Sequence, residues 1–321
     1  MSGGFLQLSG IVMDIVHRID HLPQPGEEVE ARDFMITPGG GFNAMVAARR
    51  LNAPVTYGGT LGTGNFAAMA AHALAELNIP TAATMRATAD QGSCVVLVHP
   101  NGERSFITHH GAERQLSTAH LDALDAPRYA YALLSGYTLY KAESARVMVP
   151  WLSSLPRPPL LVFDPGPTIP DIPLDALRPA LARADWISAN LAEAQFLTNT
   201  GNAAEAAEQL SKGRSGALVR VGAQGCWMAD GSGPRHIPGF AVKAIDSNGA
   251  GDTHTGAFIA ALMAAASPDQ AATVANAAAA LSTTKLGPAT APGWADIIAL
   301  LEATGRSASL PAAIGTSNRG S

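Results

Sequence analysis

Short apolar runs that end in small or polar residues recur along the chain, and segments with helical spacing of apolar positions follow them. These runs span residues 5–14, 130–136, 160–164, 186–190 and 217–222. Strands that are apolar on both faces and alternate with helices are typical of a parallel sheet covered on both sides. The pattern predicts a doubly wound, mostly parallel α/β sheet flanked by helices. Ligands of such sheets bind beyond the carboxyl ends of the strands, where Asp14 and Asp164 are expected.

One stretch departs from this alternation. Residues 93–107 form two extended runs around Asn101 and Gly102, and Asn-Gly between such runs is the strongest short-range signal for a β-hairpin. With the extended segment at residues 29–36, this hairpin is predicted to form a small antiparallel sheet outside the main fold; a surface hairpin without motion or partner is the alternative. We expect its strands at about 27–36 and 93–108, within one domain at 1–304. The Ser-, Ala- and Gly-rich residues 305–321 are predicted to be a flexible tail.

Composition narrows the class of protein. A chain of 321 residues suffices for one large α/β domain with an excursion. The formal net charge is −5 and Lys and Arg are not clustered, which argues against nucleic acid as a partner. No apolar run approaches the roughly 20 residues that span a bilayer, and the N-terminus lacks a secretory pattern, so a cytoplasmic protein without membrane contact is expected. Cys94 and Cys226 lie in strand-like apolar segments, which predicts small core residues rather than a disulfide or metal site.

The most informative segment is residues 246–258, Asp-Ser-Asn-Gly-Ala-Gly-Asp-Thr-His-Thr-Gly-Ala-Phe, which runs into an apolar, alanine-rich stretch. A turn that opens a helix offers free N–H groups and the positive end of the helix dipole, and both favour an anion. Asp252 beside them could accept a proton. Phosphoryl transfer to a hydroxyl needs this combination of anion stabilisation and a general base. The structural alternative is that Asp252 only caps the helix.

A second glycine cluster, residues 38–44, reads Pro-Gly-Gly-Gly-Phe-Asn-Ala and opens a helical pattern at 43–51. It also fits a degenerate dinucleotide fingerprint of Gly39, Gly41 and Ala44. No Asp or Glu lies between Asp33 and Glu76, so the acidic residue that would hold a ribose diol is missing. This argues against an NAD-dependent dehydrogenase; a plain tight turn is the other alternative.

Together, the two glycine segments resemble the signatures of the ribokinase-like (PfkB) family of carbohydrate and nucleoside kinases. The resemblance spans about residues 5–300. It implies a ribokinase-like fold with a β-lid over the acceptor site, and ATP-dependent phosphorylation of a primary hydroxyl of a sugar or sugar derivative. ATP and Mg²⁺ are the implied cofactors, and a homodimer through the lid is implied as well. A nucleoside kinase of the same fold, for purine nucleosides or pseudouridine, and a non-catalytic sugar-binding module remain open.

The resemblance also implies roles for individual residues. Asp252 would be the general base, with the N–H groups of Gly249, Ala250 and Gly251 as the anion hole. The expected acceptor-binding residues are Asp14, Gly39, Gly40 and Asn43.

On the nucleotide side, Asn190 and Glu193 resemble the family's N-x-x-E motif, which acts through water on Mg²⁺ and the phosphates. Glu193 could equally be an exposed carboxylate in a first helical turn. The strand and glycine turn expected to lie along the nucleotide contain Arg220, Gly222 and Gly225. Asn276 is expected to approach the adenine. Asp246 is the expected ligand of a monovalent cation, K⁺, beside the anion hole.

Two departures bear on the acceptor. Ribokinases proper carry a Lys within the Gly-Gly turn and an Asn two residues before the Asp, whereas this chain has Gly41-Phe42 and Val12. Phe42 is expected to make the acceptor pocket more apolar, which puts ribose specificity in doubt. No Gly-x4-Gly-Lys-Ser/Thr loop is present, so the phosphates would depend on the anion hole and Mg²⁺.

Overall fold

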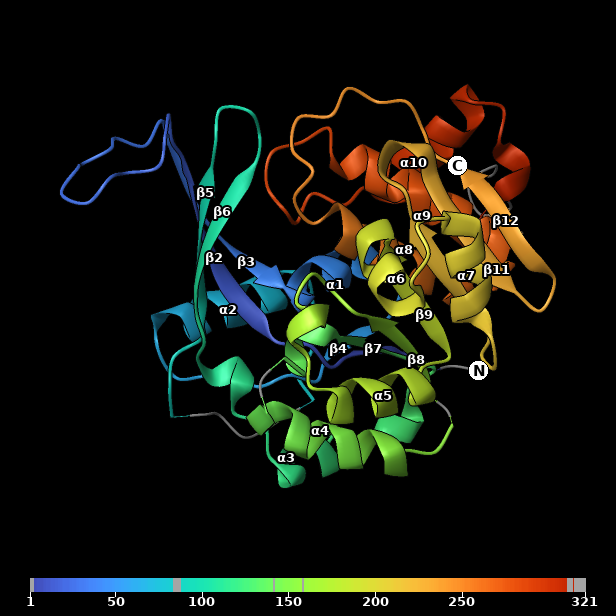
Figure 1. Cartoon of the computed structure of the whole chain (residues 1–321), viewed down its shortest axis with the longest axis horizontal. Coiled ribbons are helices and arrows are strands. Elements are labelled where there is room, and N and C mark those ends of the chain that lie inside the picture. Colours follow the sequence, from blue (N-terminus) through green and yellow to red (C-terminus); the bar gives the residue numbers. More distant parts are fainter. Residues whose placement is uncertain (1–2, 83–87, 141, 158, 311–313, 315–321) are drawn as a thin grey trace.

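The computed structural model describes residues 3–82, 88–140, 142–157, 159–310 and 314. Its main sheet has the strand order β12-β11-β10-β9-β8-β7-β1-β4 (Figure 1). The strands from β10 to β4 are parallel, and β11 and β12 add an antiparallel edge. Their bounds are β1 Phe5–Gln7, β4 Val55–Tyr57, β7 Tyr131–Ser135, β8 Leu160–Asp164, β9 Trp186–Asn190, β10 Gly216–Arg220, β11 Gly225–Asp230 and β12 Gly233–Pro238. The predicted fold class is confirmed.

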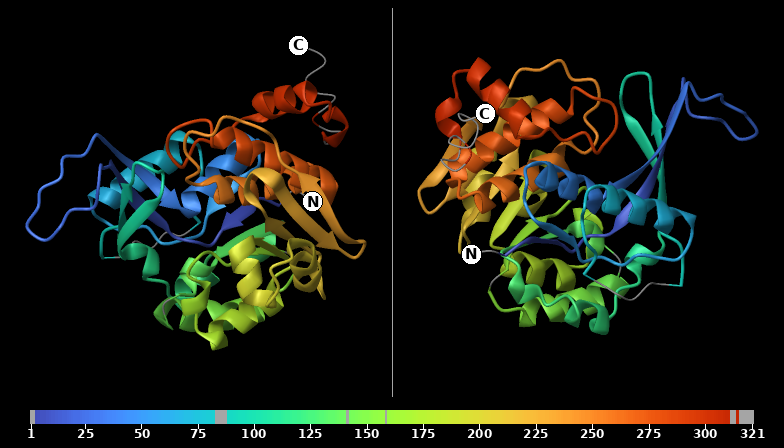
Figure 2. Two further views of the ribbon diagram at one scale, coloured as in Figure 1. Left: turned by 45° about the horizontal axis from the view of Figure 1, so that its top comes forward. Right: turned by 180° about the vertical axis from the view of Figure 1, so that it is seen from behind.

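Helices cover both faces of this sheet (Figures 1 and 2). Successive strand residues face opposite cores: Leu133 belongs to one buried cluster, while its neighbour Leu134 belongs to the other. Both clusters are apolar, because each strand is buried on both sides. The helices are α1 Gly41–Arg50, α2 Asn65–Glu76, α3 Thr118–Asp122, α4 Ala142–Ser154, α5 Leu174–Arg183, α6 Leu191–Thr198, α7 Ala203–Ser211, α8 Ala250–Met263, α9 Pro268–Ser282 and α10 Trp294–Ala303. Residues of α1, α8 and α9 belong to the first cluster and those of α4, α5 and α7 to the second.

A second sheet, with the order β3-β2-β5-β6, stands beside the main one and is called the lid here (Figure 1). Its strands are β2 Ile11–Arg18, β3 Asp33–Gly40, β5 Ser93–Val98 and β6 Arg104–His109. The predicted hairpin is confirmed: β5 and β6 are antiparallel, and Gly102 in their turn has a φ of 84°. That positive φ explains why Gly follows Asn101.

Two strand predictions were wrong. Residues 5–14 are not one strand: the chain leaves the main sheet after β1 and re-enters extended structure as β2 of the lid. Asp14 therefore lies within a lid strand rather than at the carboxyl end of a main-sheet strand. The segment expected at 27–36 pairs only from Asp33 onward and continues to Gly40. The break between β1 and β2 includes Gly10, where an added β-carbon would lie 2.5 Å from the Glu113 side chain.

The first part of the expected tail is packed onto the domain. Ser307–Ser309 form a short 3-10 helix, and the side chain of Gln270 on α9 donates to the carbonyl of Leu310 at 3.1 Å. The rest of the predicted tail, 311–313 and 315–321, lies outside the described residues. Over the described part of the chain, no helix combines the length and apolar character needed to cross a bilayer.

Candidate active site

Asp252 lies in the first turn of α8, directly after a backbone turn whose geometry requires glycine at position 249. Gly249 has a φ of 72°, and a β-carbon there would lie 2.4 Å from the carbonyl oxygen of Pro288. Of the three N–H groups expected to form the anion hole, that of Ala250 is engaged: it donates to the Ser247 carbonyl at 3.3 Å. Among the described residues, the N–H groups of Gly249 and Gly251 have no acceptor. The free donors and the helix dipole point out of this turn, which suits an anion.

Asn43 on α1 meets Asp252 on α8. Its Nδ2 donates to Oδ2 of Asp252 at 3.0 Å, while its Oδ1 is buried without a partner among the described residues. Gly40, with a φ of 60°, precedes α1 and turns the chain from the lid into the helix. A free, buried acceptor beside a carboxylate is expected where a hydroxyl group binds.

Asp252 and Asp14 both have raised pKa values. Burial raises the pKa of Asp252 to about 6; the hydrogen bond from Asn43 opposes the shift, and nearby Asp164 adds to it. Burial, followed by the charge of Asp252, raises the pKa of Asp14 to about 7. A base with a pKa near 6 is largely ionised at neutral pH and can still take a proton from a hydroxyl.

The inner face of the lid presents a polar row to the site. Asp14, Cys94 and Thr108 are in register across β2, β5 and β6, and Thr108 Oγ1 donates to Cys94 Sγ at 3.3 Å. A β-carbon at Gly39 would lie 2.2 Å from Oδ2 of Asp14, so this glycine makes room for the carboxylate. Phe42 does not enter the pocket: it is 4% exposed and packs in the core, contrary to the expectation.

Arg220 provides a positive charge behind the glycine turn that opens α8. At the end of β10, its Nη1 donates to Oδ2 of Asp164 at 2.9 Å, and its Nη2 lies 3.6 Å from Glu193. A β-carbon at Gly251 would lie 3.6 Å from the guanidinium. Arg220 is therefore an internal ion-pair partner that lies directly behind this turn.

Glu193 is buried, so the alternative of an exposed first-turn carboxylate was wrong. It forms a capping box with Asn190: the Asn190 N–H donates to Glu193 at 2.8 Å, and the Glu193 N–H donates to Asn190 Oδ1 at 2.9 Å. Burial, and then the charge of Asp164, raises its pKa to about 7, against the effect of Arg220. The N-x-x-E motif is thus a helix cap with a carboxylate facing the charged cluster.

The site has an excess of negative charge. Asp164, Glu193 and Asp252 all interact with the single guanidinium of Arg220. In the described ranges, no three His, Cys, Asp or Glu side chains are arranged to hold a metal by themselves. The excess of carboxylates fits Mg²⁺, which takes oxygen ligands and keeps several waters when it binds with substrate phosphates.

Of the residues expected near the nucleotide, the two glycines lie in an open turn, whereas Asn276 is buried and hydrogen-bonded within the protein. Gly222 and Gly225, in the turn between β10 and β11, have φ values of 61° and 97°, and a β-carbon on Gly222 would meet nothing within 4 Å. Asn276 is buried: its Nδ2 donates to the Ile237 carbonyl at 2.9 Å, and its Oδ1 lies 3.1 Å from Nε2 of His254. The Asn276 amide therefore joins α8, α9 and β12.

Asp246 already has positively charged partners. Arg104 and Arg18 of the lid both form ion pairs with its carboxylate. No local pattern in the sequence predicts these contacts, because they join residues far apart in the chain.

Tyr137 is a residue near the candidate site that the sequence analysis did not identify. It follows β7, is 47% exposed, and lies against Gly166, where a β-carbon would be 3.5 Å from its ring. Burial of the phenol, with the charges of Asp252 and then Asp164, raises its pKa to about 12. Its position after a main-sheet strand was the available signal, since Ser135 ends that strand.

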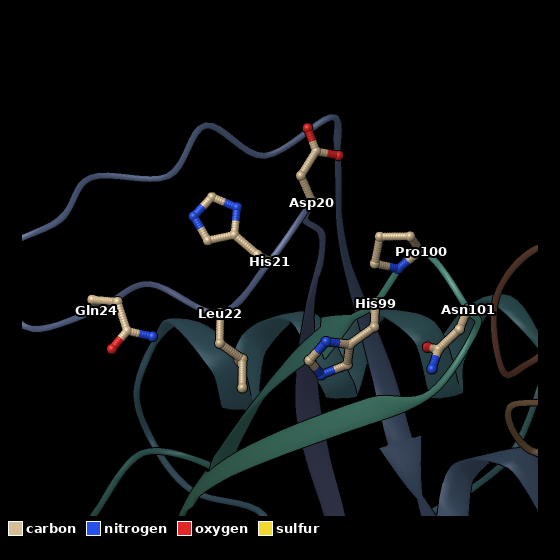
Figure 3. Close-up of a pocket in the computed structure, with 7 residues that line it drawn as sticks. All are labelled: Asp20, His21, Leu22, Gln24, His99, Pro100 and Asn101. Atoms are coloured by element: carbon tan, nitrogen blue, oxygen red, sulfur yellow. The ribbon is translucent and has the colours of Figure 1, made fainter.

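A separate open hollow of about 520 Å³ lies at the tip of the lid (Figure 3). Residues of the loop after β2 and of the turn between β5 and β6 line it, including His21 and His99. It lies beyond Arg18, where β2 ends, whereas Asp14 is in the middle of that strand, so the hollow is distinct from the site around Asp252.

Comparison with known proteins agrees with this geometry. The model of the pfkB family carbohydrate kinases matches residues 7–294. The uncharacterized sugar kinase YegV of Escherichia coli is 30% identical over 78% of this chain and 79% of its own. The ribokinase of Haemophilus influenzae is 30% identical over 87% of this chain and 92% of its own.

Solved structures share the fold. Ribokinase from Thermotoga maritima superposes with a TM-score of 0.82 at 24% identity, covering 94% of this chain and 99% of that one. Arabidopsis thaliana ribokinase complexed with ribose and ATP gives 0.76 at 22% identity, covering 94% and 99%. Burkholderia thailandensis nucleoside kinase in complex with inosine gives 0.77 at 20% identity, covering 94% and 97%.

A ribokinase-like sheet with a lid, and a carboxylate at a glycine-opened helix, define the class of protein as a phosphotransferase with an alcohol group as acceptor. The chain belongs to the pfkB family of carbohydrate kinases.

Proposed function

We propose that this protein transfers the terminal phosphoryl group of ATP to a primary hydroxyl of a sugar or sugar derivative, with Asp252 as the general base. One observation carries the proposal: Asp252 is held at 3.0 Å by Asn43, in the helical turn where the N–H groups of Gly249 and Gly251 are free. A proton acceptor and anion-binding donors thus share one turn.

The acceptor would lie between the lid and α8. Asp14 accepts hydrogen bonds from sugar hydroxyls, and the free Oδ1 of Asn43 accepts another. Asp252 takes the proton of the attacking hydroxyl as its oxygen bonds to the γ-phosphorus of ATP, while the bond from that phosphorus to the bridging oxygen breaks and ADP leaves. The free N–H groups of Gly249 and Gly251 stabilise charge on the transferred group.

The nucleotide would lie along the turn of Gly222 and Gly225, where the side of Gly222 is open. Mg²⁺, when bound, neutralises and orients the phosphates. Glu193, and Asn190 that fixes it, would act on the hydrated ion from the second coordination sphere. Arg220 keeps a positive charge behind the turn throughout. Asn276 supports β12 and α8 in this proposal rather than contacting the base.

A nucleoside is the second candidate acceptor. The nucleoside kinase with inosine shares this fold. In the present lid, an apolar row lies next to the polar one: Met35, Val16, Val96 and Phe106 are in register across the four strands. Phe106 is 61% exposed on this face, so it could contact a planar base as well as a sugar ring.

The outer face of the lid supports a homodimer. Strand alternation places Ile36, Ile15, Val95 and Ile107 in one row opposite the inner face, and Ile107 is 64% exposed. Phe34, 57% exposed, lies on the same face. An apolar sheet face of this kind is expected to be covered by another surface, and a second copy of the lid is complementary to it.

A coupled ADP-release assay over hexoses, pentoses, sugar acids and nucleosides tests the proposal. We expect one sugar-containing class to stimulate ADP release in the wild type and not in Asp252→Asn. Stimulation by nucleosides alone would establish the second candidate. Binding of a sugar by calorimetry without any ADP release would show a non-catalytic module.

A further inference from the structure

The inner face of the lid ends in charged side chains that reach the loop before the anion hole. Arg18 on β2 and Arg104 on β6 share this face, because both are in register with Val98 on the strand between them. Arg104 forms a hydrogen-bonded ion pair with Oδ1 of Asp246, and Nη2 of Arg18 lies 3.8 Å from Oδ2. The Asp246 side chain is 9% exposed, so the lid and the core largely exclude water from this contact.

The same carboxylate holds two loops of the core. Oδ1 of Asp246 accepts the N–H of Asn248 at 2.9 Å, and Oδ2 accepts the N–H of Gly287 at 3.1 Å. Asn248 directly precedes Gly249, and the backbone after Gly287 is the one that packs against Gly249. Asp246 therefore connects the lid to both segments that frame the anion-binding turn.

A second contact joins the lid to the same place. A β-carbon on Gly287 would lie 3.4 Å from the sulfur of Met35 on β3. The lid thus meets the loop of Asp246 through the ion pair of Arg104 on β6, and the loop of Gly287 through packing of Met35 on β3. Contacts from two different lid strands therefore hold both loops that frame the anion-binding turn.

We infer that Arg104 is a positioning residue of the transfer site: carried by the lid, it neutralises Asp246 and holds the anion-binding turn in place of a free monovalent cation. The catalytic part of this inference rests on the proposed function. K⁺ does not fit Asp246 as the structure has it, because a cation there would have to displace a hydrogen-bonded guanidinium and face the charge of Arg18. The expected K⁺ is therefore not part of our proposal for this chain.

Hydrogen exchange of the free protein tests the structural half without substrate. In Arg104→Met, backbone exchange across residues 246–252 should rise about tenfold, and Arg104→Lys should recover part of the protection. Arg32→Met is the matched control, since Arg32 directly precedes lid strand β3 but pairs with Asp20, and its side chain is 67% exposed. Unchanged exchange in Arg104→Met, or an equal rise in Arg32→Met, would overturn the inference.

Kinetics test the other half. Wild-type turnover should be equal in potassium and tetramethylammonium chloride, and kcat of Arg104→Met should fall about 10-fold or more, with a smaller change in acceptor KM. Several-fold activation of the wild type by K⁺, or a normal kcat in Arg104→Met, would overturn the role given to Arg104. An inactive wild type would contradict the proposed function instead. The hydrogen-exchange result would still show whether Arg104 holds residues 246–252 in place.

Discussion

Gly256 of α8 lies directly against the backbone of Ala44 of α1: a β-carbon at Gly256 would be 2.2 Å from the Ala44 carbonyl oxygen. Asn43, the residue before Ala44, holds Asp252, one helical turn before Gly256, at 3.0 Å. The close approach of the two helices therefore also sets the position of Asp252 relative to Asn43.

Gly256→Ala should separate the two helices. The added methyl group meets backbone on α1, which cannot rotate away, so we expect a loss of roughly 1–3 kcal/mol in the free energy of unfolding. We also expect a lower kcat, because Asn43 no longer reaches Asp252. Urea unfolding and ADP release measure the two effects. Gly231→Ala, where a β-carbon meets nothing within 4 Å, is the control; equal stability of both variants would contradict the argument.

Asp252→Asn should separate chemistry from binding. Asn keeps the size of Asp and can still accept from Asn43, but it cannot take the hydroxyl proton, so kcat should fall by about 10²–10⁴. The Kd of the acceptor, measured by calorimetry, should change little. Near-normal turnover would show that Asp252 is only part of the helix start.

Ionisation of the buried Asp14 carboxyl group should make the folded protein less stable as the pH rises. Its folded pKa is raised from 3.8 to about 7, so the folded state binds this proton more tightly than the unfolded state does. The resulting stability is present below pH 3.8 and is lost as the pH rises through about 7. Asp14→Asn removes the titration, so its Tm should exceed that of the wild type more at pH 8 than at pH 5. A pH-independent difference between the two melting curves would refute this.

Arg220→Met should destabilise the fold through uncompensated charge. The variant leaves Asp164 and Glu193 without their shared guanidinium, and removing one partner of a buried ion pair costs about 3–5 kcal/mol. Adding Asp164→Asn should restore part of the loss, because one buried charge is gone. Chemical denaturation of the single and double variants measures this coupling. A double variant no more stable than Arg220→Met would show that charge is not the cause.

Ile107→Asp should dissociate the proposed dimer. The charge would lie on β6, at the most exposed end of the apolar outer row, where a partner lid would have to desolvate it. Sedimentation velocity should show a dimer for the wild type and a monomer for Ile107→Asp. Leu174→Asp, at a residue that is 60% exposed at the start of α5, should remain dimeric. A monomeric wild type would remove the dimer from the proposal.

The sequence by itself determined the fold class and identified Asp252 as the residue proposed here as the base. Apolar runs on a strand period, followed by helical spacing, are local properties, so they predicted the parallel sheet and its helices. The Asn101-Gly102 turn likewise predicted the hairpin of β5 and β6. Gly249 and Asp252 could be identified as candidate site residues because the start of any helix carries free N–H groups and a positive dipole end, which favour an anion.

Tertiary structure decided the contacts between distant segments. The path of residues 5–14 depended on where Gly10 could pack, so the break between β1 and β2 was not visible as a change in hydrophobicity. The ion pairs of Asp246 with Arg18 and Arg104 join segments separated by more than a hundred residues. Arg220 became an internal counter-charge only because β8 brings Asp164 beside the end of β10. Such contacts depend on how whole elements pack, and no local pattern of residue types encodes them.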